Sequence, residues 1–306
     1  MSKAHRPLIF SARPAYLDAI SIKGRREDFS VLPPASTFSQ MSSSIDFGVF
    51  RPASLGPYLE QDPHALPVTA DREGYYGDGH FDWWLSGLND YLRVKDVLAK
   101  NGANLSSGDE LFELGCASGR VLRHFACHEP KCAVWGADIN LRHVEWVRQF
   151  LPQRIRIFQN TILPQLPIAD GTMSLVCAFS VFTHIDDMEL AWICELRRIL
   201  KPGGIAYLTI HSEHTWQRLG PGLPVYDALI SQRDKIADYR VSAELFKQPM
   251  PEDKMVFCWD ASGTYSSNVF HSTNYIRDTW GRFMEIKEII VGGHSYQDVV
   301  VMMRGD

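Results

Sequence analysis

Apolar runs and helical periods alternate through the middle of the chain. Short runs rich in apolar residues are typical of buried strands, and apolar residues recurring every three or four positions are typical of one helix face. The predicted strands are Glu110–Leu114, Ala133–Asp138, Arg154–Phe158, Ser174–Ser180 and Ile205–Ile210, and the predicted helices are Gly119–Cys127, Leu141–Phe150 and Asp187–Leu200. Strand, helix and strand in repetition predict an α/β fold with a doubly wound, mostly parallel sheet covered on both faces.

Further elements flank this alternating region. A helical period starts at His80 and ends near Asn101-Gly102, a plausible C-cap. Near the other end, a short helix over Asn274–Phe283 is followed by two β-like runs, Glu285–Val291 and Asp298–Met303. The Gly-rich segment between these runs predicts an antiparallel C-terminal hairpin, which brings the sheet to seven strands.

Two segments break the pattern. Residues 1–78 are punctuated by prolines and serines, which predicts an irregular N-terminal arm ahead of a main domain over 79–306. Residues 212–268, rich in Gly, Pro and aromatics, predict an insertion over one end of the sheet. In the arm, Tyr75 and Tyr76 stand among glycines just before Trp84. This stretch predicts either a lid that excludes water or a hydrophobic staple on the helix that follows.

Charge and composition narrow the classes of protein. The chain has 31 Lys and Arg against 36 Asp and Glu, a net charge of −5, and no basic stripe for a phosphate backbone. We therefore expect no nucleic-acid partner. The longest apolar stretch, residues 174–182, is far short of the roughly 20 residues that cross a bilayer, and no signal peptide is evident. These features predict a cytoplasmic protein with no membrane partner, and six isolated cysteines predict reduced thiols rather than disulfides or a metal site.

The strongest chemical signal is the segment Leu111–Arg120, LFELGCASGR, where a strand meets a small-residue loop and then a helix. Small residues allow a ligand to lie against the backbone, and a helix N-terminus supplies free N–H groups. As a dinucleotide fingerprint, the pattern places Arg120 in a position that close packing reserves for glycine. As acid-x-G-x-G-x-G, it falls on Glu113, Gly115, Ala117 and Gly119, with one Gly replaced by Ala.

The second spacing resembles the class I S-adenosylmethionine-dependent methyltransferases. Three further segments fit the same family in the same order: WGADI ending in Asp138, LPIADGTMSLV over 166–176, and ELRRILKPGG over 195–204. The match covers about 110–211, and it departs from the family at Ala117 and at Ser174, where Phe-Asp is more usual. The resemblance implies S-adenosyl-L-methionine as the cofactor and a Rossmann-like sheet as the fold.

The resemblance also implies a set of cofactor-binding residues. Asp138 lies 25 residues after Glu113, where an acid can bind both ribose hydroxyls, although a helix N-cap explains it equally well. The predicted cofactor contacts are Glu113, Gly115, Cys116, Ala117, Gly119, Asp138, Ile139, Asn160, Thr161, Phe179 and Ser180. Base-methylating nucleic-acid enzymes of this fold carry an Asn/Asp-Pro-Pro-aromatic tetrad at the position of Phe179, and its absence here also disfavours nucleic-acid acceptors.

Histidines after several strands are candidates for a general base. Methyl transfer needs a base when the acceptor is a hydroxyl or a protonated amine, and imidazole titrates in the right range. His184 and His211 are the predicted catalytic residues, although an ordinary surface or capping role suits either. His214 and His294 join Tyr75, Tyr76, Trp84 and Trp216 as predicted substrate-binding or lid residues. In the insertion, Trp216, Tyr226, Trp259 and Tyr265 predict either an acceptor pocket or a small core of their own.

Together these features predict methyl transfer to an oxygen or nitrogen of a small molecule or saccharide. Two alternatives stay open: a protein that binds the cofactor without catalysis, and a nicotinamide-dependent oxidoreductase. No residue in the sequence selects the acceptor.

Overall fold

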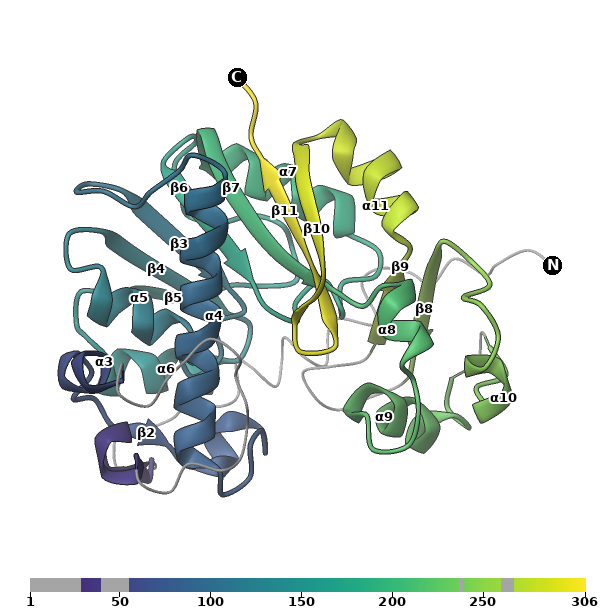
Figure 1. The fold of residues 1–306 in the computed structure, drawn as a ribbon, viewed down its shortest axis with the longest axis horizontal. Helices are drawn as coiled ribbons and strands as arrows, with labels where there is room; N and C mark the ends of the chain where they lie inside the picture. The colour runs from purple at the N-terminus through teal and green to yellow at the C-terminus, as the bar shows by residue number, and fades with distance from the viewer. Residues whose placement is uncertain (1–28, 40–54, 237–238, 260–266) are drawn as a thin grey trace. The chain divides into compact units, whose positions relative to one another are not determined.

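The computed structural model describes residues 29–39, 55–236, 239–259 and 267–306 (Figure 1). The chain divides into two compact units, whose described parts lie within 20–160 and within 161–306. In order across the main sheet, the seven strands are β10 (Glu285–His294), β11 (Gln297–Met303), β7 (Leu200–Ile210), β6 (Met173–Ala178), β3 (Glu110–Leu114), β4 (Ala133–Asp138) and β5 (Arg156–Gln159). The predicted fold, a mostly parallel seven-stranded sheet with an antiparallel C-terminal hairpin, is confirmed.

The unit within 20–160 contains the strands β3, β4 and β5, which pair in parallel. Its helices are α3 (Gly56–Gln61), α4 (His80–Lys100), α5 (Leu122–His128) and α6 (Leu141–Phe150). Its shorter elements are the antiparallel pair β1 (Val31–Leu32) and β2 (Leu66–Pro67), and the 3₁₀ turns η2 (Ala35–Phe38) and η4 (Thr69–Arg72). The side chain of Asn140 caps α6 by accepting the N–H of Arg142 at 3.0 Å.

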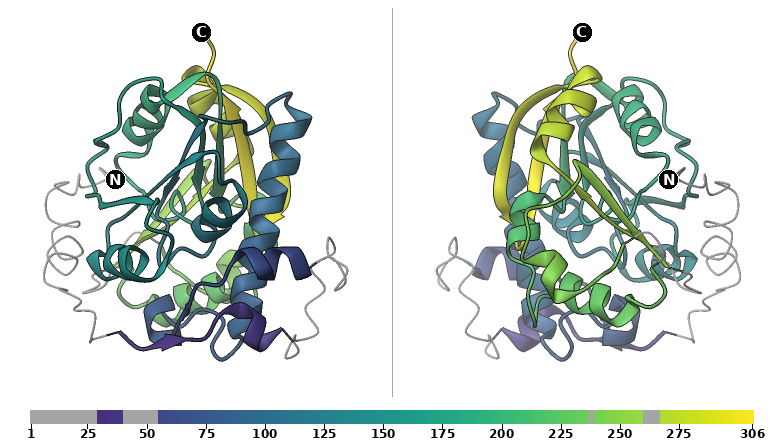
Figure 2. Two further views of the ribbon diagram at one scale, coloured as in Figure 1. Left: turned by 90° about the vertical axis from the view of Figure 1, so that its left-hand side faces the viewer. Right: turned by 90° about the vertical axis from the view of Figure 1, so that its right-hand side faces the viewer.

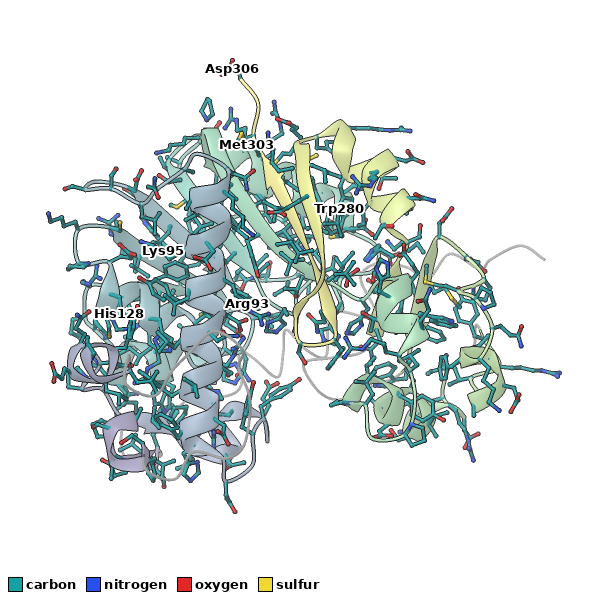
Figure 3. All side chains as sticks on the ribbon, viewed as in Figure 1. Arg93, Lys95, His128, Trp280, Met303 and Asp306 are labelled. Atoms are coloured by element: carbon teal, nitrogen blue, oxygen red, sulfur yellow. The ribbon has the colours of Figure 1, made fainter. Side chains whose placement is uncertain are left out.

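Helix α4 is the long helix that precedes the sheet, and it has the predicted start and end (Figure 2). A buried ion pair anchors the segment before it, because Arg123 Nε donates to Asp62 Oδ2 at 2.6 Å and both side chains are fully buried. Trp84 on α4 donates its indole N–H to the same carboxylate oxygen at 2.7 Å. The helices that hold Trp84 and Arg123 can be found in Figure 3 by the labelled residues Lys95 on α4 and His128 on α5. The three groups Asp62, Arg123 and Trp84 therefore join α3, α4 and α5.

The unit within 161–306 contains β6 and β7 in parallel, with β11 antiparallel to β7 and β10 antiparallel to β11. Its helices outside the insertion are α7 (Glu189–Ile199) and α11 (Thr273–Thr279), followed by the 3₁₀ turn η5 (Trp280–Arg282). Trp280 is fully buried and donates its indole N–H to Glu189 on α7 (Figure 3). His271 Nε2 and Lys254 Nζ also lie within 3.0 Å and 2.5 Å of Glu189 Oε2, so one buried carboxylate joins four segments.

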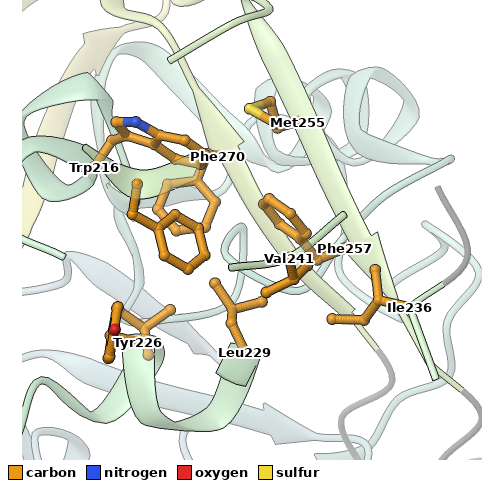
Figure 4. Close-up of a cluster of buried hydrophobic side chains, with 10 residues drawn as sticks. Trp216, Tyr226, Leu229, Ile236, Val241, Met255, Phe257 and Phe270 are labelled. Atoms are coloured by element: carbon orange, nitrogen blue, oxygen red, sulfur yellow. The ribbon is translucent and has the colours of Figure 1, made fainter. Parts of the chain in front are cut away.

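The insertion between β7 and α11 has elements and a core of its own (Figure 4). Its elements are α8 (Glu213–Gln217), α9 (Pro224–Gln232), α10 (Ala243–Phe246) and the antiparallel pair β8 (Lys254–Cys258) and β9 (Ser267–His271). Trp216 is buried in that core and donates its indole N–H to Gln248 O at 2.8 Å. The Trp216 side chain packs against Phe246, Phe257 and Phe270, which favours the small-core alternative, and its role in substrate binding stays a prediction.

Some boundaries differ from the predicted ones for local reasons. Helix α5 starts at Leu122 rather than Gly119, because the loop before it has positive φ at Gly115, Ala117 and Gly119. Strand β7 starts at Leu200, where Leu200 pairs with Met173 of β6. The hairpin turn is shorter than expected, because the glycines at 292–293 lie inside β10 next to a register shift.

Several predictions fall partly or wholly outside the described residues. Tyr265 and most of the predicted arm, at 1–28 and 40–54, lie there. All six cysteines are free thiols, and four of them are buried. In the described part of the chain, no helix combines the length and the apolarity that a membrane span requires.

Candidate functional site

The loop after β3 is the candidate site of the unit within 20–160. The main-chain N–H groups of Gly115 and Cys116 both donate to Ala137 O, at 2.8 and 3.0 Å, which holds the start of the loop against the end of β4. Gly115, Ala117 and Gly119 all have positive φ, of 69°, 46° and 82°. This conformation is easy for glycine but costs alanine about 1 kcal/mol or more, so Ala117 holds a strained backbone in the position where the family has glycine.

Two glycines allow the loop to pack tightly. A Cβ on Gly119 would lie 2.5 Å from Leu151 Cδ1 at the end of α6. A Cβ on Gly136, in β4, would lie 2.7 Å from Leu122 Cδ2 and 3.2 Å from Cys116 Sγ. A larger residue at either position would make these leucine side chains shift, and at Gly119 the positive φ also favours glycine.

Asp138 is the acid at the carboxyl end of β4. Its Oδ2 accepts the N–H of Ala117 at 2.8 Å, and its Oδ1 accepts the N–H of Asn140 at 2.8 Å. His143 Nδ1 lies 3.4 Å from Oδ1; burial lowers the pKa of His143, but the hydrogen bond and charge of Asp138 outweigh that effect and raise it. The carboxylate is thus fixed beside the loop, and each oxygen can accept further bonds because it has two lone pairs.

Glu113 is a buried carboxyl group one residue before the end of β3. Its side chain is only 3% exposed, and Oε2 has no hydrogen-bond partner among the described residues. Burial raises its pKa to about 8; the charge of Arg120 opposes the rise, and those of Asp90 and Asp138 add to it. Glu113 is therefore a mostly protonated acid at neutral pH when the site holds no cofactor.

Helix α4 supports the loop from behind, which the sequence patterns did not reveal. Gly87 on α4 approaches so closely that a Cβ there would lie 2.0 Å from Arg120 O. Arg120 Nη1 lies 2.6 Å from Asp90 Oδ2 and donates to Ser86 Oγ at 3.2 Å. A glycine inside a long amphipathic helix was the one signal that could have indicated this contact.

The structure also gives the contacts or the exposure of the other predicted site residues of this unit. Asn160 donates its main-chain N–H to Asp138 O at 3.2 Å, and Ile139 O accepts from Gln159 Nε2 at 2.9 Å, so both lie beside Asp138. Trp84 is fully buried and bonded to Asp62, and its role as a lid or substrate residue stays a prediction. Tyr75 and Tyr76 are exposed, and their role as a lid stays a prediction.

The unit within 161–306 has a candidate region of its own, where β6 and β7 end. Ser180, two residues after β6, has a φ of 57° and donates its N–H to Thr209 Oγ1 at 2.6 Å. The Gln297 side-chain amide, at the start of β11, donates to Ser180 Oγ at 2.9 Å. The Phe179 ring lies 5.3 Å from the His294 ring at the end of β10. The predicted cofactor contacts of Thr161, Phe179 and Ser180 stay predictions.

His184 and His211 occupy different environments at this end of the strands. His184 Nδ1 lies 2.6 Å from Ser267 O, so it carries the proton and donates, and burial lowers the pKa of the ring. His211 is 2% exposed, and its Nε2 accepts from the Gln297 amide at 3.4 Å. Burial, with His184 and His271 nearby, keeps the pKa of His211 well below its ordinary value. Both imidazoles are therefore neutral at pH 7, and the lone pair of His211 is occupied inside the protein.

His214 forms a hydrogen-bonded pair with a buried carboxylate. Its Nδ1 lies 2.7 Å from Asp298 Oδ2, and the Ser212 hydroxyl donates to the same oxygen at 2.6 Å. Asp298 is 1% exposed, its Oδ1 accepts the N–H of Gly292 at 2.9 Å, and it pairs with Ile210 at the end of β7. Sequence patterns do not reveal this pair, because Asp298 lies 84 positions after His214.

Among the residues that the structure describes, one cluster has metal-ligating residue types. Asp62, His64 and Cys127 offer ligand atoms within 4.8 Å of one another. The Asp62 carboxylate, however, already accepts bonds from Arg123 and Trp84, and the positive charge of Arg123 opposes a cation there. We therefore assign this cluster a structural role, and the prediction that the protein uses no metal stays a prediction.

Comparison with known proteins finds one matching family and several similar folds. Residues 112–208 match the family described as "Methyltransferase domain". Among solved structures, the complex of the Haloferax volcanii Trm112 methyltransferase activator with a methyltransferase matches with a TM-score of 0.50 and 14% identity, covering 75% of this chain and 95% of that one. A SAM-dependent methyltransferase from Methanosarcina mazei matches with a TM-score of 0.45 and 16% identity, covering 68% and 97%. No curated protein sequence matches the chain.

Proposed function

Because this chain belongs to the class I methyltransferases that use S-adenosyl-L-methionine, we propose that it methylates an oxygen or nitrogen of a small molecule or saccharide. When bound, the cofactor supplies an electrophilic methyl group on a positively charged sulfur. The residues of the protein bind and orient the reactants, exclude water and accept a proton from the acceptor.

The main support is the donor and acceptor set after β3 and β4. The loop over 115–119 presents backbone without bulky side chains, and Gly119 and Gly136 pack closely against neighbouring leucines. The Asp138 carboxylate is fixed by the N–H groups of Ala117 and Asn140 and can accept both hydroxyls of a ribose. These residues fit an adenosyl group, and we propose that Glu113, Gly115, Cys116, Ala117, Gly119, Asp138, Ile139 and Asn160 hold it.

The same residues argue against a nicotinamide cofactor. The third position of the dinucleotide fingerprint holds Arg120, whose guanidinium is committed to Asp90 and Ser86. That position needs a glycine for close packing of helix and strand around a pyrophosphate.

Two measurements test the proposed function. Calorimetry with S-adenosylhomocysteine and with NADH, side by side, should show binding of the first and none of the second. Release of S-adenosylhomocysteine from S-adenosylmethionine, measured over a panel of monosaccharides, phenols and amines, should then identify an acceptor. Binding without turnover on any compound would favour a non-catalytic binding protein, and binding of NADH alone would favour an oxidoreductase.

A further inference from the structure

We propose that His214, oriented by Asp298, is the general base of this methyltransferase and that the methyl acceptor is a hydroxyl group. This inference rests on the proposed function and assigns the base to a different histidine from the predicted pair, His184 and His211. The observations that carry the inference are the contacts of the Asp298 carboxylate.

The Asp298 carboxylate is built to hold one imidazole in one tautomer. It accepts hydrogen bonds from three donors: the Ser212 hydroxyl at 2.6 Å, the Gly292 N–H at 2.9 Å and His214 Nδ1 at 2.7 Å. Since a carboxylate only accepts, the proton between it and His214 lies on Nδ1. The lone pair of the neutral ring is therefore on Nε2.

The surroundings of His214 leave that lone pair accessible. The His214 side chain is 36% exposed, whereas Asp298 is 1% exposed. Within the described part of the chain, Nε2 has no hydrogen-bond partner. The ring thus has a buried end bound to a negative charge and an outer end that can accept a proton, which is the arrangement of a general base with its orienting acid.

Local structure fixes the position of the pair. Ser212 is the N-cap of α8, where its Oγ accepts the N–H groups of His214 and Thr215, so His214 lies in the first turn right after β7. Asp298 pairs with Ile210, the last residue of β7. In sheets with this topology, ligands bind beyond the carboxyl ends of the parallel strands, which is where His214 lies.

The two histidines predicted to be catalytic, His184 and His211, lack this arrangement. His211 Nε2 is occupied by Gln297, and the ring is buried. His184 Nδ1 donates to the main-chain carbonyl of Ser267, which has no formal charge with which to stabilise an imidazolium. Of His184, His211 and His214, His214 is the one whose contacts supply both the tautomer and the charge that a base needs.

In the proposed step, the acceptor O–H proton moves to His214 Nε2 while an oxygen lone pair forms the new bond to the methyl carbon. The carbon–sulfur bond breaks, and its electron pair stays on sulfur, giving neutral S-adenosylhomocysteine. The imidazolium, stabilised by Asp298, then releases its proton to solvent at the exposed end of the ring. A hydroxyl acceptor needs this removal of a proton, since a neutral alcohol is a weak nucleophile.

The tautomer tests the pair independently of activity. In the full chain with ¹⁵N-labelled histidine, we expect the neutral His214 ring to be protonated on Nδ1, with its signals assigned by their loss in His214→Gln. Asp298→Asn should shift the ring toward the Nε2–H tautomer, because the new amide can donate to Nδ1. A neutral wild-type ring protonated on Nε2, or a tautomer unchanged in Asp298→Asn, would overturn the proposal.

Turnover tests the chemistry. With methyl glucoside, phenol and catechol as acceptor probes and benzylamine for comparison, His214→Gln should lower S-adenosylhomocysteine release by about 100-fold or more, and Asp298→Asn by at least about 10-fold. The control His128→Gln, at a partly buried histidine of α5, should retain wild-type turnover. Affinity for S-adenosylhomocysteine should stay within about threefold in all three variants, which shows that the cofactor site is intact.

The outcomes separate the two proposals. Near-wild-type turnover in His214→Gln, or turnover of benzylamine alone by the wild-type protein, would overturn the base and the hydroxyl acceptor while leaving the methyltransferase intact. Failure of the wild-type protein to bind S-adenosylhomocysteine would contradict the proposed function, and the tautomer measurement would still decide whether the pair exists.

Discussion

Glu113 gives the stability of this protein a specific dependence on pH. In the unfolded chain the carboxyl group has its ordinary pKa of 4.5, whereas burial beside β4 raises the pKa in the folded state to about 8. A raised pKa means that the folded state binds the proton more tightly. The stability linked to the proton on Glu113 is therefore fully present below pH 4.5 and is lost as the pH rises toward 8.

The magnitude follows from the size of the shift. One pKa unit corresponds to about 1.4 kcal/mol, so a change from 4.5 to about 8 corresponds to about 5 kcal/mol in full. The interval from pH 5 to pH 8 covers most of the range between the unfolded and the folded pKa of Glu113. We expect the wild-type protein to lose about 3 kcal/mol of unfolding free energy relative to Glu113→Gln over this interval, because the glutamine is neutral at both values.

Urea unfolding of both proteins at pH 5 and pH 8, without cofactor, measures this difference. Comparing the two proteins at each pH cancels the titration of all other groups. Glu110→Gln, at the first residue of the same strand, is the matched control, since its carboxylate is partly exposed and accepts a bond from Trp135. A gap between wild type and Glu113→Gln that stays constant from pH 5 to pH 8 would refute the reasoning.

Three further predictions concern packing, charge and the cofactor. Gly119→Ala should lower the unfolding free energy by about 1 to 2 kcal/mol, because alanine is strained at this positive φ, as measured by urea unfolding; a loss under about 0.5 kcal/mol would contradict it. Arg123→Met should cost about 3 to 5 kcal/mol in thermal or urea unfolding by leaving the buried Asp62 carboxylate unpaired, and adding Asp62→Asn should recover part of the loss. Asp138→Ala should weaken S-adenosylhomocysteine binding by about 1 to 3 kcal/mol in calorimetry, and unchanged affinity would exclude the ribose contact.

Local sequence patterns were sufficient to predict the strands of the main sheet and the helices between them. Strands β3 and β4 and helix α6 have the predicted bounds, because apolar runs and a helical period are properties of contiguous residues. The loop over 113–119 and the acid at Asp138 were also evident, since the chemistry of that turn depends on residue types at fixed short spacing. The boundaries at α5 and β7 were less accurate, because backbone conformation in the loops, rather than periodicity, sets them.

The contacts between distant residues were decided only by the folded chain. His214 and Trp216 are two positions apart on α8, yet one bonds to Asp298 and the other is buried among aromatic rings. Likewise, Gly87 meets Arg120 because α4 packs against the loop. A sequence determines which residues can form a strand, a turn or a cap from their own neighbours, whereas burial, tautomer and charge partners depend on which segments meet, and that is set by the packing of the whole chain.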